Sequence, residues 1–199
     1  MARKPTSKSS NSAKSSGQVR IISGKWRSRK LPIHDLAGLR PTTDRVRETL
    51  FNWLAMDIKG ARVLDCFAGS GALGLEALSR YAEFAQMLEL QKSAAKQLQQ
   101  NLATLQCDNA NVANVDSLQY LAQPAAQGFD IIFVDPPFRQ SLADKTVNLL
   151  VENAWLNQDA LIYVETESEL SELSVPNNWV QLKQKVAGQV TYRLYQYQA

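Results

Sequence analysis

The tetrapeptide Asp135-Pro136-Pro137-Phe138 combines residues that can receive a planar amino group. It directly follows the apolar run 129–134, which predicts a buried strand. Proline has no N–H donor, so the loop offers the Asp135 carboxylate and backbone carbonyls, including that of Pro136, as acceptors only. Phe138 adds a flat face on which a base can stack. The loop therefore predicts a site for an –NH2 group, with Asp135, Pro136 and Phe138 as its catalytic residues.

A glycine-rich motif comes earlier in the chain, at 69–74, and fits the pattern G-x-G-x-x-G between a strand and a helix. The pattern by itself is typical of any nucleotide cofactor in an α/β fold. Asp65, at the end of the preceding strand, would repel a pyrophosphate at the helix N-terminus but suits an ammonium group. A ligand such as the methionine part of S-adenosylmethionine is therefore favoured over a dinucleotide.

Two further acidic residues follow the next two predicted strands. Glu89 stands where a carboxylate accepts hydrogen bonds from ribose hydroxyls in nucleotide-binding folds. Asp116 precedes a short helix, where it either contacts the adenine amino group or caps the helix. We expect S-adenosyl-L-methionine as the cofactor, and the residues expected to bind it are Asp65, Phe67, Gly69, Ser70, Gly71, Glu89 and Asp116.

The charge of the chain is divided unevenly. Residues 1–50 carry 12 Lys/Arg and 3 Asp/Glu, a net +9, whereas residues 51–199 carry 10 and 16, a net −6. A basic N-terminal quarter on an acidic body predicts a polyanionic partner. The positions expected to contact RNA phosphates, as one basic surface leading to the site, are Lys25, Arg27, Arg29, Lys30, Arg40, Arg45 and Arg47.

The N-terminal part predicts a small hairpin and a helix. Val19–Ile22 and Trp26–Leu31 are expected to be strands joined at 23–25, and alternation on the second strand places Trp26 opposite the basic residues. Thr43 or Asp44 is expected to cap a helix that runs to about position 56. Residues 1–18 are expected to be a disordered basic tail, 19–58 the RNA-binding hairpin and helix, and 59–199 the catalytic domain.

From Lys59 onward, predicted strands and helices alternate, which indicates an α/β fold with a parallel sheet covered on both faces. The expected strands are 62–66, 84–90, 111–115, 130–134 and 160–165, and the expected helices are 72–80, 92–105, 117–122 and 143–152. The last two strands, 179–186 and 190–197, alternate polar and apolar residues and are expected to form an antiparallel pair at the sheet edge.

Four segments, 20–27, 39–48, 65–71 and 135–138, resemble the bacterial 16S rRNA guanine-N2 methyltransferases of the RsmD type. The Arg-Pro-Thr block at 40–42 is the specific part of this resemblance. It implies a Rossmann-like, seven-stranded class I S-adenosylmethionine-dependent methyltransferase fold with a small N-terminal hairpin and helix extension. It also implies methyl transfer to the exocyclic N2 of one guanine in small-subunit ribosomal RNA, either free or in the assembling small subunit.

Three other functions agree with parts of the sequence. An adenine-N6 methyltransferase acting on DNA or RNA keeps the same site and changes the base. The interpretation as a dinucleotide-dependent oxidoreductase is supported by the glycine pattern alone. The interpretation as a non-catalytic RNA-binding assembly factor leaves the acceptor-only loop without a purpose. No apolar run is long enough to span a bilayer, and no His/Cys cluster has metal-ligand spacing. We expect a cytoplasmic monomer without membrane or metal partners.

Overall fold

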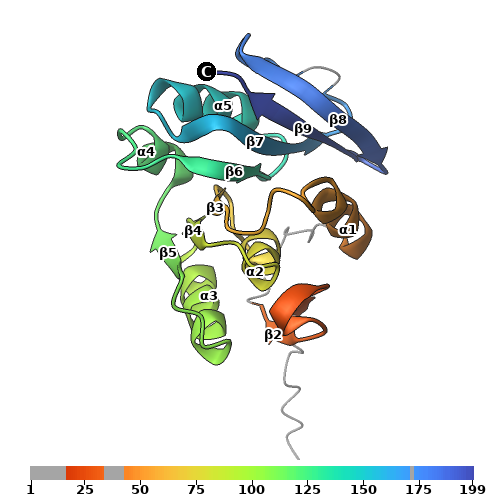
Figure 1. Cartoon of the computed structure of the whole chain (residues 1–199), viewed down its shortest axis with the longest axis vertical. Helices are drawn as coiled ribbons and strands as arrows, with labels where there is room; N and C mark the ends of the chain where they lie inside the picture. Colours follow the sequence, from red (N-terminus) through yellow and green to blue (C-terminus); the bar gives the residue numbers. More distant parts are fainter. Residues whose placement is uncertain (1–16, 34–42, 171–172) are drawn as a thin grey trace, which may run out of the picture.

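The computed structural model describes residues 17–33, 43–170 and 173–199, and its centre is a seven-stranded sheet (Figure 1). Almost all of the predicted tail, and Arg40, lie outside the described residues. The sheet strands are β3 (Arg62–Asp65), β4 (Phe84–Glu89), β5 (Ala110–Asn114), β6 (Phe129–Val134), β7 (Leu156–Glu167), β8 (Trp179–Ala187) and β9 (Val190–Tyr197). Their order is β5-β4-β3-β6-β7-β9-β8, which confirms the predicted seven-stranded α/β class.

The first five strands of the sheet are parallel, and β9 joins β7 and β8 antiparallel to both. The central strand β6 is apolar at almost every position because both of its faces are covered. The predicted antiparallel pair at the edge is confirmed, with β8 outermost. The predicted strand limits differ from the structure by one or two residues at most ends, and β7 begins four residues earlier than expected.

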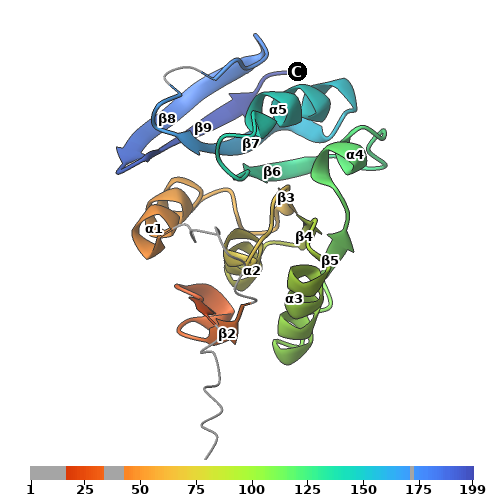
Figure 2. The same cartoon turned by 180° about the vertical axis from the view of Figure 1, so that it is seen from behind.

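Helices cover both faces of the sheet (Figures 1 and 2). The helices are α1 (Asp44–Trp53), α2 (Ala72–Ser79), α3 (Lys92–Thr104), α4 (Ser117–Leu121) and α5 (Leu142–Glu152). Helices α1, α2 and α3 pack with the hairpin in one hydrophobic cluster, and α4 and α5 pack in a second one on the other face. Thr43 is the N-cap of α1, since its Oγ1 accepts a hydrogen bond from Val46 N at 3.4 Å.

The N-terminal hairpin is a strand pair with a helical turn between its strands. β1 (Gln18–Arg20) pairs antiparallel with β2 (Lys30–Pro32), as expected, but a 3-10 turn, η1 (Gly24–Trp26), lies between them. The prediction of a strand over 26–31, with Lys25, Arg27 and Arg29 alternating on one face, is therefore wrong. Gly24 has a φ of 82° and packs so closely on α2 that a Cβ would lie 1.8 Å from Ser79 O. This close approach folds the segment into a turn.

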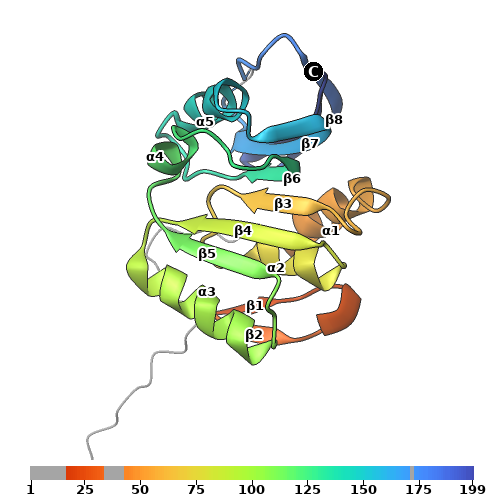
Figure 3. The ribbon, with the colours of Figure 1, turned by 60° about the vertical axis from the view of Figure 1, so that its left-hand side comes forward.

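The hairpin is fixed to the body of the protein by α2. The buried Glu76 accepts hydrogen bonds from Ile22 N at 2.7 Å, Ser23 N at 3.0 Å and Arg80 Nε at 2.7 Å. Ser79 Oγ accepts from Trp26 N at 3.1 Å and donates to the Ser23 carbonyl. Figure 3 shows β1 and β2 beside α2 and α3, under the part of the sheet formed by β3, β4 and β5. The described residues of the hairpin and of α1 thus belong to the same hydrophobic cluster as α2 and α3.

Candidate functional site

The two sequence motifs meet where the strand order of the sheet reverses. From β3 the chain proceeds outward to β4 and β5 on one side, and β6 returns to pair with β3 on the other. Cys66 N donates a hydrogen bond to Phe133 O at 3.0 Å, so the ends of β3 and β6 are directly linked. Ligands of open α/β sheets bind at the carboxyl ends of the strands at such a switch point. Asp65 and Asp135 both lie there.

Asp65 is buried against the first turn of α2. Its Oδ2 accepts a hydrogen bond from Gly74 N at 3.1 Å. Gly74 has no space for a side chain, because a Cβ would lie 2.7 Å from Met87 Sδ and 3.3 Å from Asp65 Oδ2. Burial, together with the negative charges of Asp135 and Glu89, raises the pKa of Asp65 to about 7. A cation placed at this carboxylate would favour its ionised form.

Glu89 holds the glycine-rich loop in place. Its Oε2 accepts from Gly69 N at 2.8 Å and its Oε1 from Gln91 N at 2.7 Å. Burial raises the pKa of Glu89. Gly69 and Gly71 have φ values of 52° and 76°, a left-handed conformation that favours glycine. Each carboxylate oxygen of Glu89 has a second lone pair, so the residue can still accept hydrogen bonds from ligand hydroxyls.

Asp116 is a helix cap in this structure. Its Oδ1 accepts a hydrogen bond from Gln119 N at 3.0 Å, at the start of α4. The capping interpretation is confirmed, and the contact with adenine stays a prediction. Phe67 and Ser70 are both half-buried in the loop between β3 and α2. The predicted cofactor residues therefore come from the carboxyl ends of β3, β4 and β5.

The chemistry of this set of residues fits S-adenosylmethionine. The buried carboxylates of Asp65 and Glu89 suit an ammonium group and ribose hydroxyls, respectively. Gly71 is the N-cap of α2, and a Cβ there would lie 2.4 Å from Leu98 Cδ2. This close approach and a φ of 76° both favour glycine at position 71. The two carboxylates, Asp65 and Glu89, disfavour a pyrophosphate at this point.

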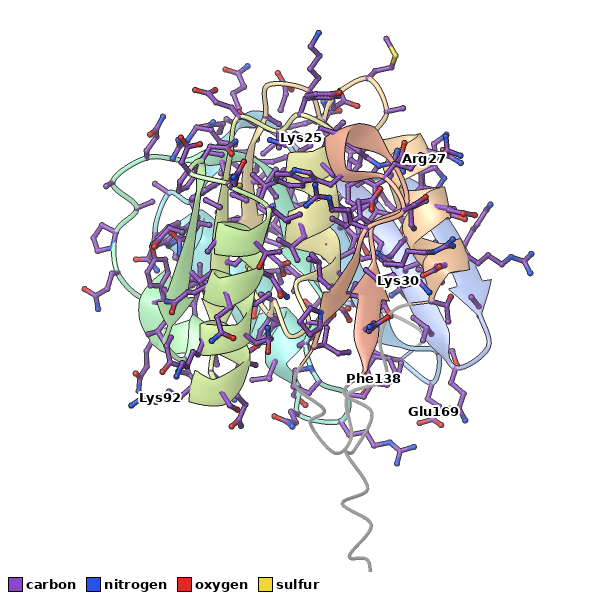
Figure 4. All side chains as sticks on the ribbon, turned by 90° about the horizontal axis from the view of Figure 1, so that it is seen from below. Lys25, Arg27, Lys30, Lys92, Phe138 and Glu169 are labelled. Carbon is purple, nitrogen blue, oxygen red and sulfur yellow. The ribbon has the colours of Figure 1, made fainter. Side chains whose placement is uncertain are left out.

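The tetrapeptide lies at the carboxyl end of β6. Pro136 is buried, Asp135 is half-buried, and Pro137 and Phe138 are exposed. In Figure 4, Phe138 lies toward the same end of the molecule as Lys92 and Glu169, which follow β4 and β7. The structure thus places the acceptor loop and the cofactor loop at one edge of the sheet, on adjacent strands, as the sequence predicted.

Glu165 is a site residue that the sequence reasoning missed. The pairing of Val134 with Val164 places Asp135 beside Glu165 at the ends of β6 and β7. Glu165 is buried, and its Oε2 accepts a hydrogen bond from Tyr163 Oη at 2.7 Å. Burial and the charge of Asp135 raise the pKa of Glu165 to about 8. The signal that identified Asp65, a carboxylate ending an apolar strand, applies equally to Glu165.

Most of the predicted RNA contacts are exposed, but they do not form one cluster beside the site. The exposed residues are Lys25, Arg27, Arg29, Lys30 and Arg45. Figure 4 shows Lys25 and Arg27 toward the end of the molecule opposite Phe138, with Lys30 between. Arg40 lies outside the described residues.

Arg47 is the exception, and its prediction as a surface phosphate contact is wrong. Only 2% of it is exposed, because its guanidinium is held by Asp44 Oδ1 at 2.5 Å and the Arg20 carbonyl at 3.0 Å. Its Nε and Nη1 have no hydrogen-bond partner among the described residues. Arg20 also pairs with Asp44, at 2.9 Å, and lowers the pKa of that carboxyl. Arg47 therefore joins the hairpin to α1.

A cavity of about 490 Å³ connects the hairpin with the cofactor loop. Its described lining includes Arg20, Lys30 and Arg47 on the basic side, and Ser70 and Ala72 at the start of α2. Within the described ranges, no helix is long and apolar enough to cross a bilayer. Residues 17–33, 43–170 and 173–199 also contain no group of three or more His, Cys, Asp or Glu side chains suited to a metal ion.

Two solved structures have a fold similar to that of this chain. A putative methyltransferase from Escherichia coli is 56% identical, with a TM-score of 0.86, and the match covers 92% of this chain and 99% of that one. The 16S rRNA N2 G1207 methyltransferase of Thermus thermophilus, solved in complex with AdoMet and guanosine, is 22% identical with a TM-score of 0.67. That match covers 92% of this chain and 50% of the other, and it shows a common fold.

Sequence relatives cover nearly the whole chain. The family described as Conserved hypothetical protein 95 matches residues 19–196. The ribosomal RNA small subunit methyltransferase D of Escherichia coli K12 is 59% identical over 92% of both chains. The protein of the same name from Haemophilus influenzae is 55% identical over 90% of this chain and 94% of that one. The chain therefore belongs to the RsmD-type family of S-adenosylmethionine-dependent methyltransferases.

Proposed function

We propose that this protein methylates the exocyclic N2 of one guanine in 16S ribosomal RNA. The observation that carries the proposal is the position of Asp135-Pro136-Pro137-Phe138 on β6, directly beside the Asp65 end of β3. The names of the relatives add the class of substrate, because they are small-subunit ribosomal RNA methyltransferases. An oxidoreductase or a non-catalytic RNA binder would need neither this loop nor this neighbour.

The loop 135–138 makes the exocyclic amine of the base a better nucleophile. The lone pair of an exocyclic amine is delocalised into the ring, so the amine is a poor nucleophile until its hydrogens are held. The Asp135 carboxylate and the Pro136 carbonyl accept those two hydrogens, and Phe138 stacks on the base. The bound cofactor supplies the electrophilic methyl group. As the N–C bond forms, the bond between the methyl group and the cofactor sulfur would break, and its electron pair would stay on the neutral thioether that leaves. The nitrogen would then carry one excess proton, for which the Asp135 carboxylate is the acceptor.

Fixed geometry is the main contribution of the protein. Holding two reactants in line replaces a bimolecular encounter, which can lower the barrier by about 7–11 kcal/mol. The rigid ends of β3 and β6, linked by the Cys66–Phe133 hydrogen bond, are suited to this task. The proline pair limits the freedom of the loop that follows β6.

The N-terminal hairpin is the RNA-binding element in this proposal. Lys25, Arg27, Arg29, Lys30 and Arg45 are exposed and contact phosphates, which position the RNA without selecting the base. The target guanine must lie in a loop or be flipped out, because a base inside a duplex cannot reach Phe138.

Adenine-N6 methylation is the second candidate, since an adenine amine fits the same acceptors. The two are separated by incubating the purified protein with labelled S-adenosylmethionine and small ribosomal subunits from cells that lack it. The labelled RNA is then digested to nucleosides and chromatographed. We expect N2-methylguanosine as the labelled product. N6-methyladenosine, or a product methylated at carbon, would contradict the proposal.

The same assay on protein-free 16S rRNA identifies the state of the substrate. Contacts along the whole hairpin, from Lys25 to Lys30, favour a particle with ordered RNA over a flexible free strand. We therefore expect faster transfer to the subunit or its assembly intermediate. Equal rates on both substrates would show that the hairpin reads local RNA structure alone.

A further inference from the structure

Carboxylates lie near the carboxyl ends of three neighbouring strands. Asp65 is the last residue of β3, Asp135 directly follows β6, and Glu165 is two residues before the end of β7. Asp65 on β3 pairs in register with Phe133 on β6, which pairs with Tyr163 on β7. Side chains two residues apart on a strand point to the same face, so Asp135 and Glu165 follow Phe133 and Tyr163 on this face. Neighbouring strands are about 4.8 Å apart, which sets the spacing of the row. Asp65 belongs to the cofactor and Asp135 to the amine, whereas Glu165 has no role in the proposed reaction so far.

Glu165 is held rigidly and keeps one acceptor available. Tyr163 Oη donates to Oε2 at 2.7 Å, and Oε1 makes no hydrogen bond within the described part of the chain. The ring of Tyr163 is in turn fixed by an edge-to-face contact with Phe133, with ring centroids 6.4 Å apart. Glu165 also lines a small cavity with Pro136 and Pro137 of the acceptor loop. The carboxyl group is therefore positioned beside the loop that receives the base.

The Watson–Crick edges of the two candidate bases differ in the atom next to the reacting amine. Guanine carries an N1–H donor beside its N2 amine, whereas adenine has the bare N1 acceptor beside its N6 amine. A carboxylate oxygen accepts from the first and repels the second. Guanine is therefore selected by a site in which two acceptors receive the hydrogens of the amine and a neighbouring carboxylate accepts a hydrogen bond from N1–H.

We propose that Glu165 selects the base by accepting the N1–H of the target guanine while Asp135 and Pro136 hold its N2 amine. This proposal rests on the proposed guanine-N2 activity and names the residue that makes the activity specific. Binding of a cationic cofactor beside the row of carboxylates, and of the N1–H donor, both favour the ionised form of Glu165. The same side chain disfavours adenine, whose N1 lone pair would face a carboxylate oxygen.

The test uses two nucleosides that share the C2 amine. Guanosine has N1–H, whereas 2-aminopurine riboside has an unprotonated N1 that can only accept. Both are titrated calorimetrically into the protein loaded with sinefungin, whose protonated amine replaces the sulfonium of the cofactor. We expect the wild type to prefer guanosine by at least about tenfold, as a site built around a donor rejects the analogue that lacks it. Glu165→Met, of similar length but without an acceptor, should bring the two affinities within about threefold.

Two further variants separate selection from a structural role. Glu165→Gln keeps an oxygen that can accept N1–H but adds an NH2 donor for the bare N1 of 2-aminopurine, so its preference should fall between those of the wild type and Glu165→Met. Glu169→Gln makes the same chemical change at an exposed position nearby and should behave like the wild type. A wild type without a preference for guanosine, or a Glu165→Met variant that keeps it, would overturn the proposal.

The product assay distinguishes this failure from failure of the proposed function. If the wild type forms N2-methylguanosine in subunits and Glu165→Met keeps its guanosine preference, the function stands and the role of Glu165 is wrong. If the wild type forms another methylated nucleoside, the guanine-N2 function itself fails, and the selection proposal fails with it.

Discussion

Replacing Glu76 by alanine should release the N-terminal hairpin from α2. The carboxylate is buried and accepts three hydrogen bonds, from Ile22 N, Ser23 N and Arg80 Nε. Its removal leaves two backbone N–H groups and one guanidinium without their shared acceptor. Breaking one partner of a buried ionic network costs about 3–5 kcal/mol. In a chain of this length, each kcal/mol lowers Tm by about 2–4 °C, so we expect a loss of about 6–20 °C.

The measurement combines thermal unfolding with trypsin digestion. The exposed Lys25, Arg27, Arg29 and Lys30 of the hairpin are trypsin sites that become more accessible when the hairpin leaves α2. The matched control is Glu83→Ala, which removes an exposed carboxylate seven positions after Glu76 and should change Tm by less than about 2 °C. If Glu76→Ala unfolds and is cleaved like the wild type, the account of the hairpin as a docked element is refuted.

Four other substitutions test the site and the basic surface. Asp65→Asn should weaken binding of S-adenosylmethionine, measured by calorimetry, yet raise the stability of the free protein at pH 8, measured by thermal unfolding. The pKa of about 7 in the folded protein lies above that of the unfolded chain, so the wild type loses folding stability as the pH rises from about 4 to 7. Asparagine does not ionise, so the variant avoids this loss. Lys30→Ala should lower the affinity for RNA and reduce the slope of log K against log salt concentration by about 1. Arg47→Ala should chiefly lower Tm, since Arg47 is buried. Gly74→Ala should weaken cofactor binding, measured by calorimetric titration, since its Cβ would meet Met87 Sδ at 2.7 Å and push on Asp65.

Three of these expectations have clear opposites. Asp65→Asn that is no more stable than the wild type at pH 8 would mean that the carboxyl is not strained by burial. If Arg47→Ala keeps the Tm of the wild type but loses affinity for RNA, Arg47 contacts phosphate after all. Gly74→Ala with unchanged cofactor affinity would show that the first turn of α2 adjusts without cost.

Much of the fold follows from local patterns in the sequence. The run 129–134 is apolar because β6 is covered on both faces. The alternation in 179–186 indicated a strand, but it does not mark a buried face, since every residue from Val180 to Val186 in the edge strand β8 is exposed. The glycine motif predicts a loop between a strand and a helix, and the structure has this loop between β3 and α2, with Gly71 at a φ of 76°. Strand ends that carry Asp65 and Glu89 were predicted from their position alone, since parallel strands bring their carboxyl ends to one edge.

The features that were missed depend on contacts between distant segments. The turn at Gly24–Trp26 forms because Gly24 fits against Ser79, more than fifty positions away, and no local signal reports that contact. Arg47 is buried because Asp44 and the Arg20 carbonyl receive its guanidinium, which helical periodicity does not reveal. Glu165 could have been found, because it is the last residue of the predicted apolar strand 160–165, but its place beside Asp135 follows only from the register of β6 and β7.

The central claim is that the Asp135 loop delivers a guanine amine to the cofactor at the end of β3. It is tested most directly in cells that lack the protein, complemented with the wild type or with Asp135→Ala, by mass spectrometry of nucleosides from small-subunit rRNA. We expect the wild type to restore one N2-methylguanosine, and Asp135→Ala to bind S-adenosylmethionine normally in vitro without restoring it. Full restoration by Asp135→Ala, or a missing modification that lies on adenine, would contradict the account.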